Sequence, residues 1–263
     1  MSAPDFHTII VGAGFSGIGA AIQLDKAGLG DYLILEAGEE PGGTWYWNTY
    51  PGIAVDIPSF SYQFSFAQSA DWSRTYAKGA ELKRYAERCV DEYGLRRKIR
   101  FATLVSAAAF DDETDCWRVE LDDGDTLTAR FLVNASGVLS VPKLPDIDGV
   151  DGFAGITMHT ARWDHSQDLT GKRVAIIGTG ASAVQVIPEI APIVKQLSVF
   201  QRTPIWCMPK LDVPLPAAAR WAMRIPGGKV LQRVLSQAYV ELTFTISAQY
   251  YTVFPLANRA EKM

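Results

Sequence analysis

The sequence contains only three cysteines, and they are not spaced to act together. Cys89, Cys116 and Cys207 lie far apart, form no C-x-x-C pair, and form no metal-ligand cluster with the three histidines. This pattern excludes a redox-active dithiol and predicts no metal site. An odd number of scattered thiols is typical of a reducing compartment, so we predict three structural thiols and a cytoplasmic protein.

Basic clusters and long apolar runs are also missing. The chain has 25 Lys and Arg against 29 Asp and Glu, with no concentrated basic run, so we predict no nucleic-acid partner. Met1–His7 carries no Lys or Arg ahead of the apolar Ile9–Val11, which argues against a secretory signal. The apolar stretch Val234–Ala257 is interrupted by polar residues and a proline, which predicts no transmembrane segment. We interpret it as a helical packing face, with membrane-surface binding as the alternative.

The first part of the chain has the pattern of a β-α-β unit. Phe6–Val11 is a short apolar run that ends in glycines, which predicts a buried parallel strand. Apolar residues then recur at helical spacing from Ile18 to Leu24, and Tyr32–Glu36 predicts the second strand. The chain has 263 residues, of which 48% are hydrophobic, enough for one large domain or two modest ones.

The turn between this strand and helix reads Gly12-Ala-Gly14-Phe-Ser16-Gly17, a Gly-x-Gly-x-x-Gly motif. In this context a dinucleotide pyrophosphate rests on the helix N-terminus. Gly12 permits the tight turn, Gly14 lets the phosphates approach the backbone, and Gly17 lets the helix and strand pack closely. The motif predicts a dinucleotide site that includes Ser16.

The middle of the chain alternates between a loop, a helix and short strands. Pro41–Asp56 holds many turn residues and aromatics, so we interpret it as a functional loop without regular structure; its aromatics could instead form a satellite core. Ala80–Tyr93 has the apolar spacing of a helix. A β-meander insertion is predicted over Ile99–Val105, Ala107–Phe110, Trp117–Leu121 and Thr126–Val133.

A second glycine turn predicts a second β-α-β unit. The strand Lys172–Ile177 leads into a turn, then a helix to about Ile190 and the strand Leu197–Gln201. Glu36 follows Gly12 by 24 residues, and Arg202 follows the first glycine of the second turn by 24 residues. The predicted cofactor contacts of this turn are Gly178, Thr179, Gly180, Ser182 and Ala183.

The two units place opposite charges where each second strand ends, a position that faces the adenosine ribose. The carboxylate of Glu36 would accept hydrogen bonds from ribose hydroxyls and repel a 2′-phosphate, so the first unit is predicted to bind FAD. The guanidinium of Arg202 suits a phosphate dianion, so the second unit is predicted to bind NADPH.

Between the two units lies a segment that matches a known family at every fixed position. Phe153-x-Gly155-x-x-x-His159-x-x-x-Trp163-Asp164 resembles the fingerprint of the type I Baeyer-Villiger monooxygenases. The aromatic loop from Gly42 to Asp56, the segment Gln201–Pro204 and the turn Asn134–Gly137 are similar to the same family. The resemblance implies a flavoprotein that uses NADPH and O₂, through a flavin C4a peroxide, to insert oxygen beside a ketone or aldehyde carbonyl.

The resemblance also implies roles for individual residues. Asp56 is implied to lie where nicotinamide and flavin meet and to hold an arginine in position. The alternative is a structural role, in which its carboxylate is capped by hydrogen bonds within the loop. His159 is implied to be a pivot between domains, whereas an isolated histidine would be structural. These two are the candidate catalytic residues. Further residues implied to contact a cofactor are Thr44, Trp45, Tyr46, Trp47, Tyr62, Val105 and Thr203.

These observations predict an α/β fold with two Rossmann-like β-α-β units, a β-meander insertion and an incomplete second domain. The expected parts are an FAD-binding domain (1–140), a linker carrying the fingerprint (141–170), a partial NADP-binding domain (171–216) and a helical segment (217–263). Nothing after Arg202 matches the arginine segment of the family, so we expect an N-terminal portion. The alternatives are a non-catalytic flavin-binding fragment and a monooxygenase that oxidises nitrogen or sulfur.

Overall fold

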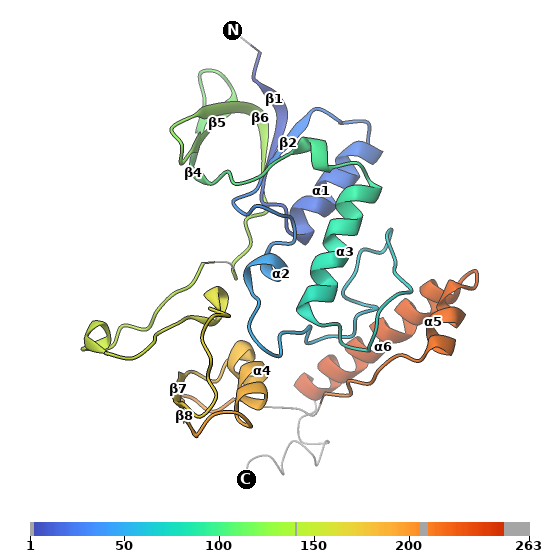
Figure 1. The fold of residues 1–263 in the computed structure, drawn as a ribbon. Coiled ribbons are helices and arrows are strands. Elements are labelled where there is room, and N and C mark those ends of the chain that lie inside the picture. Colours follow the sequence, from blue (N-terminus) through green and yellow to red (C-terminus); the bar gives the residue numbers. More distant parts are fainter. Residues whose placement is uncertain (1–2, 140, 206–209, 250–263) are drawn as a thin grey trace. The chain divides into compact units, whose positions relative to one another are not determined.

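The computed structural model describes residues 3–139, 141–205 and 210–249, and the chain divides into two compact units (Figure 1). Unit 1 comprises Met1–Tyr50 and Ala80–Asp164, and unit 2 comprises Pro51–Gly79 and His165–Met263. Both units are discontinuous in sequence. The chain leaves unit 1 directly after the fingerprint, since Asp164 is the last residue of that unit.

Unit 1 contains a six-stranded sheet in the order β3-β2-β1-β6-β5-β4. Strands β1, β2, β3 and β6 are parallel, whereas β4, β5 and β6 form an antiparallel meander. The predicted β-α-β unit and meander are therefore confirmed, and β6 belongs to both because it also pairs with β1. The strands are β1 (Phe6–Val11), β2 (Tyr32–Leu35), β3 (Ile99–Arg100), β4 (Val105–Asp111), β5 (Cys116–Leu121) and β6 (Thr126–Asn134).

The prediction of one strand from Ile99 to Val105 was wrong. Strand β3 ends at Arg100, and Ala102 has a φ of 49°. The Ala102 N–H donates to the carbonyl of Gly38 at 2.9 Å, and the Thr103 N–H donates to the carbonyl of Glu36 at 2.9 Å. The chain leaves the extended conformation here because it is bonded to the turn after β2, and the meander begins only at Val105.

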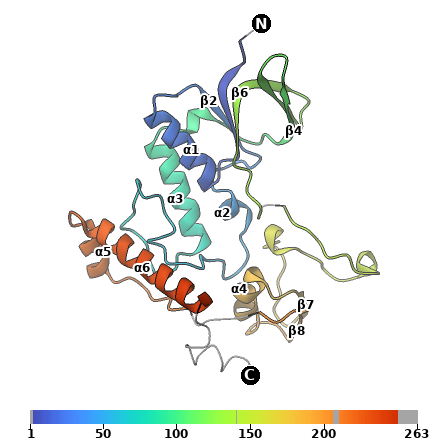
Figure 2. The ribbon, with the colours of Figure 1, turned by 180° about the vertical axis from the view of Figure 1, so that it is seen from behind.

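Helices pack on the sheet of unit 1 and build its core. Helix α1 (Phe15–Lys26) and helix α3 (Gly79–Glu92) lie side by side, with the rings of Phe15 and Tyr85 5.6 Å apart (Figures 1 and 2). Buried apolar residues on the strands and helices include Ile9, Ile10, Ile18, Ile22, Leu35 and Leu82. The loop predicted to lack regular structure contains one helical turn, α2 (Thr44–Trp47), which is a further correction.

Unit 2 contains the second predicted β-α-β unit. Strand β7 (Arg173–Ile177) pairs in parallel with β8 (Gln196–Phe200), and α4 (Ala181–Ile190) connects them. The last residues of both strands are exposed to solvent, Ile177 at 60% and Phe200 at 58%. Helices α5 (Ala217–Arg224) and α6 (Gly228–Gln249) follow. These two helices lie in the segment predicted to be helical, whose part from 250 to 263 lies outside the described residues.

The segment Pro51–Gly79 packs against later parts of unit 2. The Thr75 N–H donates to the carbonyl of Val213, and the Arg233 guanidinium donates to the carbonyl of Gln63 at 2.9 Å. The part of unit 1 that the structure describes also contains the short 3₁₀ turns η1 (Arg96–Lys98), η2 (Val150–Gly152) and η3 (Thr160–Arg162). Among the helices that the structure describes, none is long and apolar enough to span a membrane.

Candidate nucleotide-binding sites

The first glycine turn is closely packed. The Gly12 N–H donates to the carbonyl of Leu35 at 2.7 Å, and Gly12 has a φ of +101°, which side-chain-bearing residues rarely adopt. A Cβ on Gly12 would lie 2.6 Å from the carbonyl oxygen of Ala135. A Cβ on Gly17 would lie 1.9 Å from the carbonyl oxygen of Gly12. Both positions therefore require glycine, as the motif predicts.

A second pair of glycines lies against this turn. The Gly42 N–H donates to the carbonyl of Ala13 at 3.0 Å, and a Cβ on Gly43 would lie 2.9 Å from the Cα of Gly14. Gly14 is the N-cap of α1 and provides no side-chain cap, while Ser16 in the first turn is exposed. The bare backbone around Gly14 and the helix N-terminus together fit the charge and shape of a pyrophosphate.

Glu36 lies at the end of β2 with its carboxylate directed at this turn. The residue is 4% exposed, and its two oxygens accept hydrogen bonds from the N–H groups of Ala13 (2.6 Å) and Gly38 (2.7 Å). An ionised carboxylate has about four lone-pair directions. Each oxygen therefore keeps acceptor capacity for a ribose hydroxyl after binding one backbone N–H.

The aromatic loop and the end of the fingerprint meet within unit 1. The guanidinium of Arg162 lies 4.2 Å from the ring centre of Trp47, and the rings of Tyr46 and Trp47 meet edge to face at 4.8 Å. The half-buried His159 accepts a hydrogen bond at Nδ1 from the Ala161 N–H (3.0 Å) and thereby caps η3. Sequence reasoning missed Arg162, which occupies a variable position of the fingerprint.

Other predicted contacts of unit 1 lie on α2 and on β4. Thr44 begins α2, and Trp45 is buried at 8% exposure. Val105 is the first residue of β4 and pairs with Leu121. The structure thus brings the first glycine turn and the aromatic loop together within one unit.

The second glycine turn has the same backbone and much less packing. Gly178 has a φ of +106°, and its N–H donates to the carbonyl of Phe200 at 2.8 Å, as Gly12 does to Leu35. Among the described residues, no atom lies within 4 Å of a Cβ built on Gly178 or Gly180. Ala183 is buried, Thr179 and Ser182 are half-buried, and Arg202 and Thr203 are exposed.

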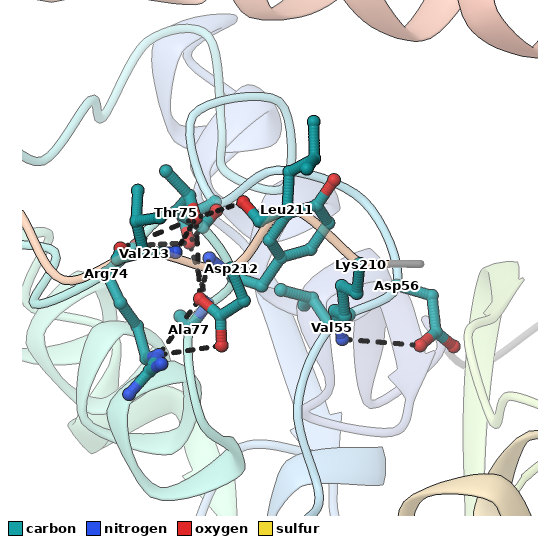
Figure 3. Close-up of polar contacts among 11 residues, drawn as sticks. Val55, Asp56, Arg74, Thr75, Ala77, Lys210, Leu211, Asp212 and Val213 are labelled. Atoms are coloured by element: carbon teal, nitrogen blue, oxygen red, sulfur yellow. Dashed lines mark hydrogen bonds and ion pairs between the residues drawn. The ribbon is translucent and has the colours of Figure 1, made fainter. Parts of the chain in front are cut away.

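Asp56 belongs to unit 2, not to the unit that holds α2. Gln185 on α4 donates from Nε2 to Asp56 Oδ1 at 3.0 Å, and Lys210 Nζ lies 3.6 Å from the same oxygen (Figure 3). The Lys210 ammonium also donates to the carbonyl of Val55. Burial lowers the pKa of Lys210 against the opposing effect of Asp56. Neither Gln185 nor Lys210 was predicted, because each contact spans more than a hundred residues. Tyr62, also in unit 2, is half-buried.

A second ion pair stands beside this one. Arg74 donates from Nε to both carboxylate oxygens of Asp212 at 2.9 and 2.8 Å, and the Tyr76 N–H also donates to Asp212 (Figure 3). Burial acts to raise the pKa of Asp212, but the hydrogen bonds from Arg74 and Tyr76 outweigh it and hold the pKa below its ordinary value. This pair clamps the segment before α5 to the 73–77 segment. Within the described ranges, no cluster of three or more His, Cys, Asp or Glu could hold a metal.

Comparison with known proteins places these features in a family. Residues 9–215 match the family model of the pyridine nucleotide-disulphide oxidoreductases. A Baeyer-Villiger monooxygenase of Streptomyces coelicolor is 46% identical over 234 residues, covering 89% of this chain and 45% of the relative. One of Pseudomonas aeruginosa is 44% identical over 203 residues, covering 77% of this chain and 38% of the relative. The chain therefore spans less than half the length of these relatives.

Solved structures that resemble this chain belong to the same group of monooxygenases. The OTEMO complex with FAD and NADP has a TM-score of 0.81 at 39% identity, covering 88% of this chain and 45% of that one. An oxidised steroid monooxygenase bound to NADP has a TM-score of 0.77 at 43% identity, covering 84% of this chain and 43% of that one. At these identities and TM-scores the solved structures share the fold of this chain.

Proposed function

Because the chain belongs to the pyridine nucleotide-disulphide oxidoreductase family and matches an N-terminal portion of Baeyer-Villiger monooxygenases, we propose that it carries the cofactor-binding part of an FAD- and NADPH-dependent monooxygenase. The proposed substrates are O₂ and a small ketone or aldehyde, with one oxygen atom inserted beside the carbonyl. The observation that carries the proposal is the pair of equivalent strand ends, one with a buried carboxylate and one with an exposed guanidinium.

FAD is assigned to the turn of unit 1. The Gly12–Gly17 backbone and the facing Gly43 would hold the pyrophosphate, and the acceptor capacity left on Glu36 would bind the ribose hydroxyls. A 2′-phosphate would be repelled by this carboxylate. The half-buried faces of Tyr46 and Trp47 offer the flat apolar wall that a flavin ring needs.

NADPH is assigned to the turn of unit 2. The N-terminus of α4 would bind the pyrophosphate, and Arg202, 24 residues after Gly178, would bind the 2′-phosphate. Its exposed guanidinium is free to adopt the paired geometry that phosphate oxygens favour. Thr203 is proposed to support the same phosphate.

In the proposed reaction FAD supplies the chemistry that passes electrons from NADPH to O₂. The residues of this chain bind and orient the two nucleotides and exclude water. Asp56 is proposed to hold a cation close to the reacting groups, and His159 is proposed to couple the fingerprint to the aromatic loop. A local contact supports the second role, because η3, which His159 caps, carries the Arg162 that lies over Trp47.

A non-catalytic flavin-binding fragment is the second candidate. It is favoured by the exposed apolar ends of β7 and β8, where Ile177 and Phe200 lie. Oxidation of nitrogen or sulfur is less favoured, because the Trp163-Asp164 ending and Asp56 both follow the Baeyer-Villiger pattern.

The test is to purify the protein, record its flavin absorbance spectrum, and measure NADPH consumption with and without a test ketone. The proposal expects bound FAD, preference for NADPH over NADH, and an ester or lactone product. Bound FAD without NADPH-dependent turnover would support the second candidate. Absence of bound flavin after reconstitution with FAD would contradict both.

A further inference from the structure

Among the described residues, the Asp56 carboxylate contacts Gln185 and Lys210, which both belong to its own unit. The Gln185 amide uses both of its ends on the loop: Oε1 accepts from the Ala54 N–H at 3.2 Å, and Nε2 donates to the Ala54 carbonyl and to Asp56 Oδ1, each at 3.0 Å. A Cβ on Gly52 would lie 2.4 Å from the carbonyl oxygen of Gln185. The loop is therefore seated on α4, the helix that follows the second glycine turn.

Lys210 supplies a positive charge at the same carboxylate. Its Nζ lies 3.6 Å from Asp56 Oδ1, donates to the Val55 carbonyl, and stands 4.9 Å from the ring centre of Tyr76 (Figure 3). The lysine side chain is 33% exposed, whereas that of Asp56 is 66% exposed. The cation is thus the sheltered partner, and the carboxylate remains accessible to a ligand.

We propose that Gln185 and Lys210 are positioning residues for Asp56, so that Asp56 is fixed to the NADPH-binding helix α4 and carries its own cation. This inference rests on the proposed function, because the catalytic role of Asp56 is part of that proposal. The contact itself is independent of that function. Lys210 would be a further cation at this carboxylate, in addition to the arginine that the resemblance implies from further along the chain.

The sharpest test replaces the amide by a carboxylate. In Gln185→Glu the acceptor for the Ala54 N–H is kept, but the donor to the Ala54 carbonyl and to Asp56 is lost, and two carboxylates face each other until one takes up a proton. Gln185→Leu loses the hydrogen bonds at every pH. Gln196→Glu makes the same chemical change at an exposed position of β8 and serves as the control. Other charged or titratable groups around this site are Lys210, Lys78, Asp212, Glu189 and Tyr76.

Two readouts are measured between pH 4.5 and 8.5: the melting temperature and the rate at which NADPH reduces bound FAD. Gln185→Glu should lose about 2–4 °C more at pH 8.5 than at pH 4.5, relative to the native protein. Its reduction rate should fall by about 10- to 100-fold at pH 8.5 and recover toward pH 4.5, because Asp56 is displaced only when both groups are ionised. Gln185→Leu should be impaired equally across the range.

Lys210 is tested on the Gln185→Glu background. Adding Lys210→Met should widen the pH difference, because no cation then offsets the two carboxylates, and Lys210→Arg should restore the smaller difference. A profile for Gln185→Glu that matches Gln196→Glu would overturn the role of Gln185. An unchanged profile on adding Lys210→Met would overturn the role of Lys210.

Failure of the proposed function gives a different result. If the native protein binds no FAD, or its FAD is not reduced by NADPH, the proposed function fails. The melting temperatures alone then test whether Gln185 and Lys210 position Asp56. If native reduction is normal and Gln185→Glu lacks the pH effect in both readouts, the positioning inference fails while the proposed function stands.

Discussion

The two glycine turns share one backbone and differ in what surrounds them. In unit 1 the turn is enclosed by Ala135 and Gly43, and Glu36 is fixed by two backbone N–H groups. In unit 2 a Cβ built on either of the first two glycines of the corresponding turn meets no described atom within 4 Å beyond its chain neighbours, and Arg202 is exposed. The local motif sets the turn, while distant chain segments determine how closely the site is packed. Changes in unit 1 should therefore affect folding, and matching changes in unit 2 should affect binding alone.

The largest effect is expected from Gly17→Ala. The added Cβ would lie 1.9 Å from a backbone oxygen that cannot move without opening the turn, so we expect destabilisation of about 3 kcal/mol or more and loss of FAD. In the second turn the position equivalent to Gly17 is already Ala183, and Gly180→Ala, at the N-cap of α4, places a Cβ with no described atom within 4 Å beyond its chain neighbours and should cost at most about 1 kcal/mol. Urea unfolding and flavin absorbance measure both. Equal destabilisation by Gly17→Ala and Gly180→Ala would contradict the difference in packing between the two glycine turns.

Glu36→Gln should have an intermediate effect. The amide keeps one acceptor but turns its NH₂ group toward the N–H of Ala13 or Gly38, which leaves a buried donor unsatisfied. The expected cost is about 1–3 kcal/mol, with weaker FAD binding. The counterpart Arg202→Gln is exposed and should change stability by no more than about 0.5 kcal/mol. A native melting temperature for Glu36→Gln would contradict the role of these hydrogen bonds.

The smallest effect concerns the acid dependence of unit 2. The pKa of Asp212 is lower in the folded protein than in the unfolded chain, so its pairing stabilises the fold above the unfolded pKa near 4 and is lost as the pH falls through the folded pKa. We expect a loss of about 1 kcal/mol or less, because both partners are partly exposed. Urea midpoints at pH 6 and pH 3 measure it. Asp212→Asn should abolish this part of the pH dependence, and an unchanged dependence would exclude Asp212 as its source.

Much of the fold could be predicted from the sequence because its signals are local. The apolar run before Gly12 and the glycine spacing specify β1, α1 and β2, and the same pattern recurs around Gly178. The strand break at Ala102 could not be predicted, because it depends on hydrogen bonds to Glu36 and Gly38, more than sixty residues away.

The candidate sites divide in the same way. The residues of the two turns were found because their spacing is fixed by the turn itself. Gln185, Lys210 and Arg162 were missed, since each is defined by a contact across the chain. A glutamine four residues inside α4 carries no distinctive pattern, and Lys210 is one of several lysines. The assignment of Asp56 to unit 2 likewise depends on packing.

The sorting of cofactors by charge is tested most directly by measuring NADPH, NADH and FAD affinities in Arg202→Ala. Loss of a charge-assisted contact should lower the preference for NADPH over NADH by roughly 10- to 100-fold, because such hydrogen bonds contribute about 1.5–3 kcal/mol. The FAD affinity should stay within about twofold of the native value, which corresponds to a change in binding free energy below about 0.5 kcal/mol. An unchanged nucleotide preference, or a parallel loss of FAD, would contradict the assignment of NADPH to the second turn and FAD to the first.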